Sequence, residues 1–365
     1  MLFGTLARGL QPWPPVVPSS LGAIGDVRMF SFRTLVVACQ VATLWITWPL
    51  WQVRASPPML PAFPLPAFDL GWLLVFSLLL VLVAPVPGIT LQSILLLYAV
   101  LIDQTRLQPG VVSLLLLLWG TVPNPTAQGF ARAHLLTLWL FAGFHKLLSP
   151  AFLNDTAPRL LTGFPLDLPQ WLITNGGYVI AFAELGTGLL ALSMRTRKAA
   201  ALMAFGLHIA ILLNLSQLGI NRNDAVWPWN IALAFAGFAL IAPWKESLLR
   251  SIAMCHALAR PLLICLLVAP LGFYLGLMDA YLAHNLYSAN TPQATVLCRD
   301  ECLPHQNPNA IWEAFRVPPP PEQRLFEQYF VLTCRPGDQL LIRDSRLWFT
   351  SHDLASRRVS CPSPH

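Results

Sequence analysis

The sequence predicts an all-α polytopic membrane protein with about nine transmembrane helices and a small extracytoplasmic α+β tail at the C-terminus. Charged residues make up only 11% of the 365 residues and hydrophobic residues 55%, whereas soluble domains carry about 25% charged residues. The mean hydropathy is +0.58. The apolar residues also form long uncharged runs, and a helix needs about 20 such residues to cross a bilayer. Composition and run length therefore both indicate a membrane protein.

Nine apolar ranges approach the length of a membrane span. They are 30–50, 68–86, 88–102, 107–123, 131–149, 171–193, 198–218, 225–243 and 260–282. The third and fourth are short and flank the polar turn Asp103–Arg106. A single broken or re-entrant pair is the alternative for these two, because so polar a turn is not stable in contact with lipid.

These ranges divide the chain into three parts. Residues 1–28 contain the Pro-rich run QPWPPVVP, which interrupts any signal-peptide core. We therefore expect a cytoplasmic N-terminal segment without a cleaved leader. Residues 29–283 form the transmembrane domain, and residues 284–365 form the tail.

The basic residues of the connecting loops predict the orientation. They gather at four positions: Arg8, Arg28 and Arg33; Arg132; Arg195, Arg197 and Lys198; and Lys245, Arg250 and Arg260. With nine spans all four positions fall on one side, which the positive-inside rule assigns to the cytoplasm. The tail is then outside. The net charge of +6 is scattered between apolar runs, so it does not indicate nucleic-acid binding.

The tail contains four of the seven cysteines, Cys298, Cys302, Cys334 and Cys361. They suit disulfide bonds in an oxidising compartment, and the sequence leaves the three possible pairings open. A metal site is the weaker interpretation, because no matched His/Cys pair accompanies them at zinc-site spacing. The segment EQRLFEQYFVLTC is predicted to be a short amphipathic helix or a strand. After the turn Pro336–Asp338, QLLIRD and RLWFT, joined through Ser345, are predicted to form a pair of strands.

The range 131–149 ends in the ionisable pair His145-Lys146, just before Pro150. Lys146 shares a helical face with Ala142 and Gly143, and such small residues allow another helix to approach closely. We therefore expect Lys146 to point into the bundle, with snorkelling to the lipid headgroups as the alternative. His145 lies on a neighbouring face and fits an interface residue.

Further polar residues lie in the later ranges. Glu184 lies near the middle of its range, where an acid is costly unless it is paired or protonated. His208 lies near mid-membrane and Asn214 further out, while Trp227 and Asn230 begin the eighth range. Trp227 and Trp229 also fit an interfacial aromatic belt. If these helices are neighbours, Lys146, Asn214 and Asn230 share the outer half above Glu184 and His208. That arrangement predicts a polar pocket that opens outward or sideways.

Four stretches together resemble the membrane domain of the vitamin K-dependent gamma-carboxylase family, the HTTM domain. They are AGFHKL, LLLYAVLIDQTR, AELGTGLLALSMRTRKAAALMAFGLHIAILL and DAYLAHNLYSAN, and they cover roughly 30–290. The resemblance is to bacterial relatives and implies the bacterial inner (plasma) membrane. It also implies nine spans, and it assigns to Lys146 the role of the base that deprotonates a reduced quinone.

Two departures limit what the resemblance implies. His145 stands where the family has a first Lys. The family's polar, His-containing stretch before the early helix is replaced here by the more apolar run TLQSILL, which leaves Gln92. The tail is also shorter than the lumenal part with which the carboxylase holds its protein substrate. The run GLLALSMRTRKAA is similar to DoxX-like membrane subunits, which work near quinones.

Two hypotheses for the function follow. In the first, a pocket binds a quinone or lipid-like ligand, with Lys146 as base, Glu184 and His208 as partners that set its pKa, and His145, Asn214, Trp227 and Asn230 as ligand-binding residues. In the second, the chain is a non-enzymatic subunit or scaffold whose intramembrane polar residues lock helices together. A transporter is disfavoured, because no pair of broken helices recurs in two halves.

Overall fold

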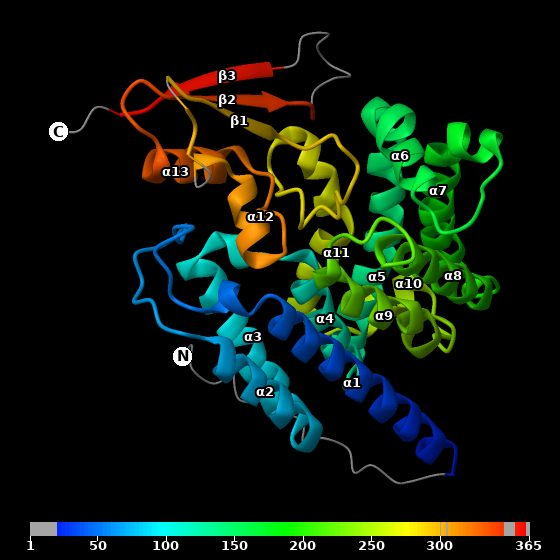
Figure 1. The fold of residues 1–365 in the computed structure, drawn as a ribbon. Helices are drawn as coiled ribbons and strands as arrows, with labels where there is room; N and C mark the ends of the chain where they lie inside the picture. The colour runs from blue at the N-terminus through cyan, green and yellow to red at the C-terminus, as the bar shows by residue number, and fades with distance from the viewer. Residues whose placement is uncertain (1–19, 300, 304–305, 347–354, 363–365) are drawn as a thin grey trace, which may run out of the picture.

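The computed structural model describes residues 20–299, 301–303, 306–346 and 355–362. Within these ranges the chain forms thirteen α-helices and one small sheet (Figure 1). The Pro-rich run that we assign to the cytoplasm lies outside the described residues. The predicted class, a mostly helical chain with a small α+β tail, is confirmed.

The helices of the bundle follow one another with short connections. They are α1 (Ser20–Ile46), α2 (Gly71–Val83), α3 (Pro85–Ile102), α4 (Pro109–Gly120), α5 (Pro125–Leu147), α6 (Ala157–Thr162), α7 (Gln170–Leu192), α8 (Arg197–Leu215), α9 (Trp227–Ala236), α10 (Leu248–Met254) and α11 (Arg260–Val268). Short 3-10 and π-helical segments extend several of them, including Phe152–Thr156 before α6, Gly237–Ile241 after α9 and Ala269–Leu275 after α11.

Each of the nine predicted ranges overlaps a helix, but nine spans are not confirmed. Five described segments have the length and hydropathy to cross a membrane: Val27–Ile46, Pro85–Ile102, Arg197–Leu215, Asp224–Ile241 and Ala257–Leu275. A sixth is Pro125–Leu147 together with Phe152–Thr162, if this pair, bent by 88°, is one span. The helices α2 and α4 have 13 and 12 residues, and at 1.5 Å per residue they fall short of a hydrocarbon core of about 30 Å.

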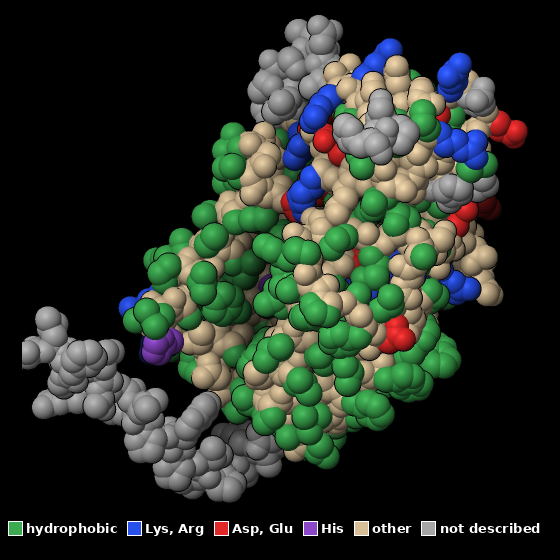
Figure 2. Space-filling view, turned by 90° about the vertical axis from the view of Figure 1, so that its left-hand side faces the viewer, with side chains coloured by type: hydrophobic (Ala, Val, Ile, Leu, Met, Phe, Trp, Pro, Cys, Tyr) green, Lys and Arg blue, Asp and Glu red, His purple; other side chains and the backbone are tan. Residues whose placement is uncertain are grey.

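Hydrophobic side chains cover most of the helical part on the face shown in Figure 2, and charged side chains gather over the tail. Large exposed side chains such as Phe76, Leu97 and Phe182 belong to the helices. Apolar surface of this extent is unusual on a soluble monomer. It therefore agrees with helices that face lipid.

The polar turn between α3 and α4 is buried in protein. Asp103 and Arg106 are 0% and 1% exposed, and Asp103 forms an ion pair with Arg54 from the connection between α1 and α2. The Asp103 carboxylate also accepts a hydrogen bond from the Thr105 hydroxyl at 2.8 Å, and the Arg106 guanidinium donates to the Leu50 carbonyl at 2.8 Å. The turn thus meets the requirement that irregular polar backbone in a membrane domain be shielded from lipid.

The connections between helices gather at two ends of the bundle. At one end Arg54 contacts Thr105, and Gln104 contacts Gln328 of the tail at 3.2 Å. Arg316 of the tail also pairs with Asp224, just before α9. The opposite termini of α1, α4 and α9 therefore lie at a second end of the bundle.

At the second end the basic side chains contact the connections. The Arg33 guanidinium donates to Thr121 at 3.1 Å, Arg132 to the Leu240 carbonyl at 3.2 Å, and Arg197 to the Glu246 carbonyl at 2.8 Å. The Thr126 hydroxyl accepts from the His256 amide at 2.9 Å. The bundle therefore has a basic end and a tail end.

The tail packs one amphipathic helix against a three-stranded antiparallel sheet. The sheet has the order β1 (Gln293–Leu297), β2 (Gln339–Asp344) and β3 (Ala355–Ser360). Helix α13 (Gln323–Thr333) buries Phe326 and Phe330 against Leu340 and Ile342 of β2, and α12 (Asn309–Phe315) precedes it. The segment for which helix and strand were both open is thus the helix α13. The strand prediction for QLLIRD is confirmed by β2, which pairs with β1 and β3. The second predicted strand, RLWFT, lies after Arg346 outside the described residues.

Two disulfides lie within the tail. Cys298 is bonded to Cys302, and Cys334 is bonded to Cys361. The second ties the end of α13 to the residue after β3, so it closes the unit across a separation of 27 residues. The three cysteines of the bundle, Cys39, Cys255 and Cys265, are free.

The tail is held on the bundle by polar contacts around the start of α13. Arg324 donates to the Asp279 carboxylate at 2.7 Å, and the Glu322 carboxylate accepts from the Ala280 amide at 2.7 Å. Glu322 is 5% exposed. Burial raises its pKa to about 7, and Asp279 adds to the increase, while the hydrogen bond from Ala280 and the charges of Arg346 and Arg324 oppose it.

We expect this raised pKa to make the docking of the tail pH-dependent. The folded protein holds the Glu322 proton more tightly than the unfolded chain does. The contribution of Glu322 to the stability of the folded state is therefore complete below about pH 4.5 and is lost as the pH rises through about 7. At about 1.4 kcal/mol per pKa unit the loss is at most about 3 kcal/mol. Hydrogen exchange of the tail between pH 5 and 8 measures it, and Glu322→Gln should remove the dependence. An equal dependence in wild type and variant would contradict this assignment.

Candidate functional site

Lys146 and Glu184 form a buried ion pair between α5 and α7. The ammonium donates to the Glu184 carboxylate at 2.7 Å, and the two side chains are 6% and 9% exposed. A Cβ atom at Gly143 would lie 2.4 Å from the Leu185 amide nitrogen, so only glycine allows the two helices to approach this closely. Lys146 thus points into the bundle, as its small neighbours predict, rather than snorkelling to the headgroups.

An aromatic side chain also contacts this pair. The ring centroid of Phe152 lies 5.6 Å from the Lys146 ammonium and adds a cation–π contact. Removal of either partner would leave one charge buried without compensation. The pair therefore joins α5 to α7 directly.

His208 joins three helices in a second polar cluster. Its Nε2 accepts from the Trp139 indole of α5 at 3.2 Å, and its Nδ1 lies 2.9 Å from the Asn230 amide oxygen of α9. An indole N–H only donates and an amide oxygen only accepts. These partners therefore define a neutral imidazole with its proton on Nδ1. Asn230 in turn donates to the Val226 carbonyl at 2.9 Å.

His145 belongs to a third cluster and is 0% exposed, so it does not lie at the lipid interface. Its Nε2 lies 2.9 Å from the Ala283 carbonyl oxygen and its Nδ1 lies 2.7 Å from the Tyr274 hydroxyl. Because a carbonyl only accepts, Nε2 carries the proton. His145 thus fixes the segment after α11 against α5.

The structure does not unite the predicted site residues in one pocket. Lys146 pairs with Glu184 and His208 with Asn230, and none of these four lines either of the two cavities described below. Asn214 and Trp227 lie outside both cavities too, and each has one buried polar atom, Oδ1 and Nε1, for which the described residues supply no partner.

The larger cavity, of about 340 Å³, lies between the bundle and the tail. Its walls come from the tail-end termini of α1, α4 and α9, from α6, from the segment after α11 and from the start of the tail. The lining residues include Thr47, Trp51, Gln108, Gly110, Asn223, Trp229, Tyr281, Asn285, Tyr287, Trp312 and Pro318. Its size falls in the range of small-molecule sites.

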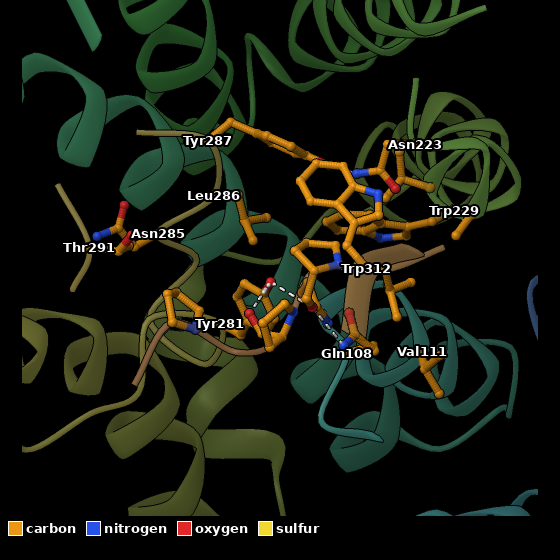
Figure 3. Close-up of a pocket in the computed structure, with 18 of the residues that line it drawn as sticks. Gln108, Val111, Asn223, Trp229, Tyr281, Asn285, Leu286, Tyr287, Thr291 and Trp312 are labelled. Atoms are coloured by element: carbon orange, nitrogen blue, oxygen red, sulfur yellow. Dashed lines mark hydrogen bonds between the residues drawn. The ribbon is translucent and has the colours of Figure 1, made fainter. Parts of the chain in front are cut away.

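Two polar atoms in the cavity wall have no partner among the described residues. They are the Trp229 indole nitrogen and the Asn223 side-chain oxygen, and these residues are 5% and 8% exposed. The Asn223 amide nitrogen donates to the Tyr287 hydroxyl. Figure 3 shows Trp229, Trp312, Asn223 and Tyr287 close together on one side of the cavity. One donor and one acceptor beside aromatic rings suit a ligand with a polar head.

The roof of the cavity is the Pro-rich segment of the tail. The Tyr281 hydroxyl donates to the carbonyls of Pro318 and Pro319, each at 3.3 Å, and Gln108 donates to Pro318 at 3.2 Å (Figure 3). The bond from Gln108 joins the bundle to a segment 210 positions later in the chain. Sequence patterns that repeat along one helix cannot identify such a site.

A smaller groove of about 50 Å³ adjoins the cavity. Leu116 of α4 and Leu266 of α11 form parts of its walls, together with His134 and His284. The two imidazole rings lie 5.2 Å apart, and they contact the hydroxyls of Ser113 and Thr137, at 2.7 and 3.1 Å. Within the described residues no group of three or more His, Cys, Asp or Glu side chains is placed to hold a metal ion.

Comparisons with protein-family models, with curated proteins and with solved structures found no match to this chain. The resemblances to the HTTM domain and to DoxX-like subunits therefore stay predictions.

We expect Lys146→Met and Glu184→Leu each to destabilise the protein by about 3–5 kcal/mol, because each leaves a buried charge unpaired. The double variant should recover most of this loss. Unfolding in detergent, followed by tryptophan fluorescence, measures the change. Arg159→Met is the matched control, because it breaks an ion pair with side chains 71% and 58% exposed and should cost no more than about 1 kcal/mol. A double variant no more stable than either single variant would contradict a clamp between α5 and α7.

Proposed function

We propose that this chain is an integral protein of a bacterial inner membrane that binds a quinone or lipid-like ligand in the cavity between its helical bundle and its tail. The observation that carries the proposal is the cavity itself, with an aromatic wall and two buried polar atoms, on Asn223 and Trp229, that the described residues leave unpaired. The resemblance to the HTTM domain favours a quinone among such ligands.

The two ends of the bundle support a topology with nine spans. Nine alternating spans require the connections before α2, α4 and α9 to lie on the side of the tail, and their contacts with one another and with the tail agree with this. The same count requires Arg33, Arg132, Arg197 and Arg260 on the other side, which agrees with the basic end. In this proposal the tail is extracytoplasmic, and α2 and α4 cross a locally thinned or partly protein-lined region.

The role of Lys146 separates the two candidate functions. As a base it would need a neutral amine that reaches the ligand, but its ammonium contacts Glu184 and it does not line the cavity. The alternative, a scaffold in which polar residues only join helices, is favoured by the pairing of Lys146 with Glu184 and of His208 with Asn230. Ligand binding in the cavity is compatible with this structural role of Lys146.

The proposed topology places His365 outside the cytoplasm and Lys245 inside it. We therefore expect a reporter that is active only outside the cytoplasm, such as alkaline phosphatase, to be active when fused after His365 and inactive when inserted after Lys245. A reporter that fluoresces only inside should behave in the opposite way. As a second readout, reduction should expose four additional thiols to maleimide, because two disulfides lie in the tail. Activity of both reporters on the unexpected sides would contradict the nine-span orientation.

For the ligand we expect organic extracts of the purified protein to contain an enriched quinone or other lipid that is lost in Gly110→Val. A Cβ atom at Gly110 would lie 3.3 Å from the Trp229 ring, so valine should push that ring into the cavity and lower occupancy about tenfold or more. Gly206→Val is the matched control, because a Cβ atom there meets nothing within 4 Å. Mass spectrometry of the extracts measures the change.

Three further outcomes interpret the extraction. If the Lys146 side chain has only a structural role, a folded Lys146→Met variant should still contain the ligand. Loss of the ligand from a folded Lys146→Met protein would instead support a direct role of the amine. Identical extracts from the wild type and Gly110→Val would leave the scaffold function as the better proposal.

A further inference from the structure

The cavity under the tail has a wall without ionisable acids or bases. Among the described residues that line it there is no Asp, Glu, Lys, Arg or His. Its polar groups are neutral amides and hydroxyls, such as those of Gln108, Asn223 and Tyr287. A phosphate or carboxylate in such a site would lose its hydration without gaining a counter-charge, which is strongly unfavourable. The wall therefore favours the binding of a ligand whose head group is uncharged.

The smaller groove is mostly aliphatic, and one of its walls belongs to α11, a helix with exposed apolar side chains. Its walls include Val112 and Leu116 of α4, Leu138 of α5, and Leu266 of α11. On the same helix α11, Leu262 and Ile264 are 64% and 48% exposed. Figure 2 shows a hollow in the apolar surface on the face that it draws. A volume of about 50 Å³ can seat a few methylene groups, while the rest of a chain would lie along exposed aliphatic surface.

The groove and the cavity share three wall residues, Pro109, Trp229 and Tyr281. Tyr281 is held in place by its hydrogen bonds to the roof. The Trp229 indole has no such bond within the described residues, although it is 5% exposed. Rotation of the Trp229 ring would thus break no hydrogen bond of its own. Because the ring borders both spaces, that rotation would connect them.

We infer that the ligand has an uncharged head and enters sideways from the bilayer, with one hydrocarbon chain in the groove between α4 and α11. The inference rests on the proposed function, because it concerns the ligand of the same cavity. Trp229 is then the ring that separates the head in the cavity from the chain in the groove. A neutral water-soluble molecule would not occupy the groove. Contact between a hydrocarbon chain and the groove therefore distinguishes a neutral lipid from a neutral water-soluble ligand.

The first experiment compares two photoactivatable lipids with identical diazirine-bearing chains, a diacylglycerol and a phosphatidic acid. Each is added to phosphatidylcholine vesicles that contain the wild-type protein, and labelled peptides are identified by mass spectrometry. We expect the diacylglycerol to label peptides of α4 and α11 about tenfold more than the phosphatidic acid does, because only the uncharged head can enter the cavity. Equal labelling by both lipids would overturn the selection of an uncharged head.

The second experiment blocks the groove. Leu266→Trp fills the seat between α4 and α11 and should reduce labelling by the diacylglycerol about tenfold, because two or more methylene groups lose their apolar contact. Leu262→Trp is the matched control on the same helix, because residue 262 is 64% exposed, and it should leave labelling unchanged. If Leu266→Trp fails to fold, Leu266→Ala, which widens the groove, should speed the uptake of the diacylglycerol. Unchanged labelling in Leu266→Trp, or unchanged uptake in Leu266→Ala, would overturn the lateral route.

The outcomes separate this inference from the function on which it rests. A wild-type extract without any enriched quinone or lipid, together with no labelling of cavity peptides, overturns both. An enriched ligand whose occupancy responds to Gly110→Val but not to Leu266→Trp keeps the cavity and overturns only the lateral route. An enriched anionic lipid keeps the cavity as a site and overturns only the uncharged head.

Discussion

Polar side chains inside an apolar bundle must find their partners within the protein, because lipid offers neither donors nor acceptors. This constraint determines which helices of the chain are neighbours. The pair of Lys146 and Glu184 joins α5 to α7, and His208 joins α5, α8 and α9 through Trp139 and Asn230. The bundle that results has fixed tail-end termini, and these termini form one part of the cavity wall. The polar residues thus shape the cavity without lining it.

This pairing is incomplete in the wall of the cavity, as it is at some buried residues outside it, such as Asn214 and Trp227. Asn223 and Trp229 each keep one buried polar atom for which the described residues supply no partner. A buried donor or acceptor without a partner costs about 1–3 kcal/mol, and a bound molecule that satisfies both atoms would recover that cost. The site is therefore characterised by buried polar atoms without a protein partner more than by charged or reactive side chains. This favours recognition of a neutral molecule over acid–base chemistry.

The class of the fold and the burial of Lys146 were predictable from the sequence, because both depend on local patterns. Low charge and apolar runs predict membrane helices, and Ala142 and Gly143 predict a face that another helix can approach. The partner of Lys146 was not predictable as such, since Glu184 lies 38 residues later on another helix. The predicted span count exceeds the number of described segments that meet the criteria of length and hydropathy. The helices α2 and α4 are too short, with 13 and 12 residues, and α7 has 23 residues but is not among the segments that meet both criteria. The cavity was missed because Trp229 fitted an aromatic belt and Trp312 belongs to the tail, so no periodic pattern connects them.

The order of the wall residues along the chain has a consequence for biogenesis. The floor of the cavity, from Thr43 to Trp229, is synthesised before the roof that contains Trp312 and Pro318. During synthesis the tail-end termini of α1, α4 and α9 are consequently uncovered, and the aromatic wall faces its surroundings directly. The roof closes only when the last quarter of the chain has been made and Cys334 can bond to Cys361. A molecule that occupies the cavity can thus also be enclosed while the protein matures, before the lateral route is its only entrance.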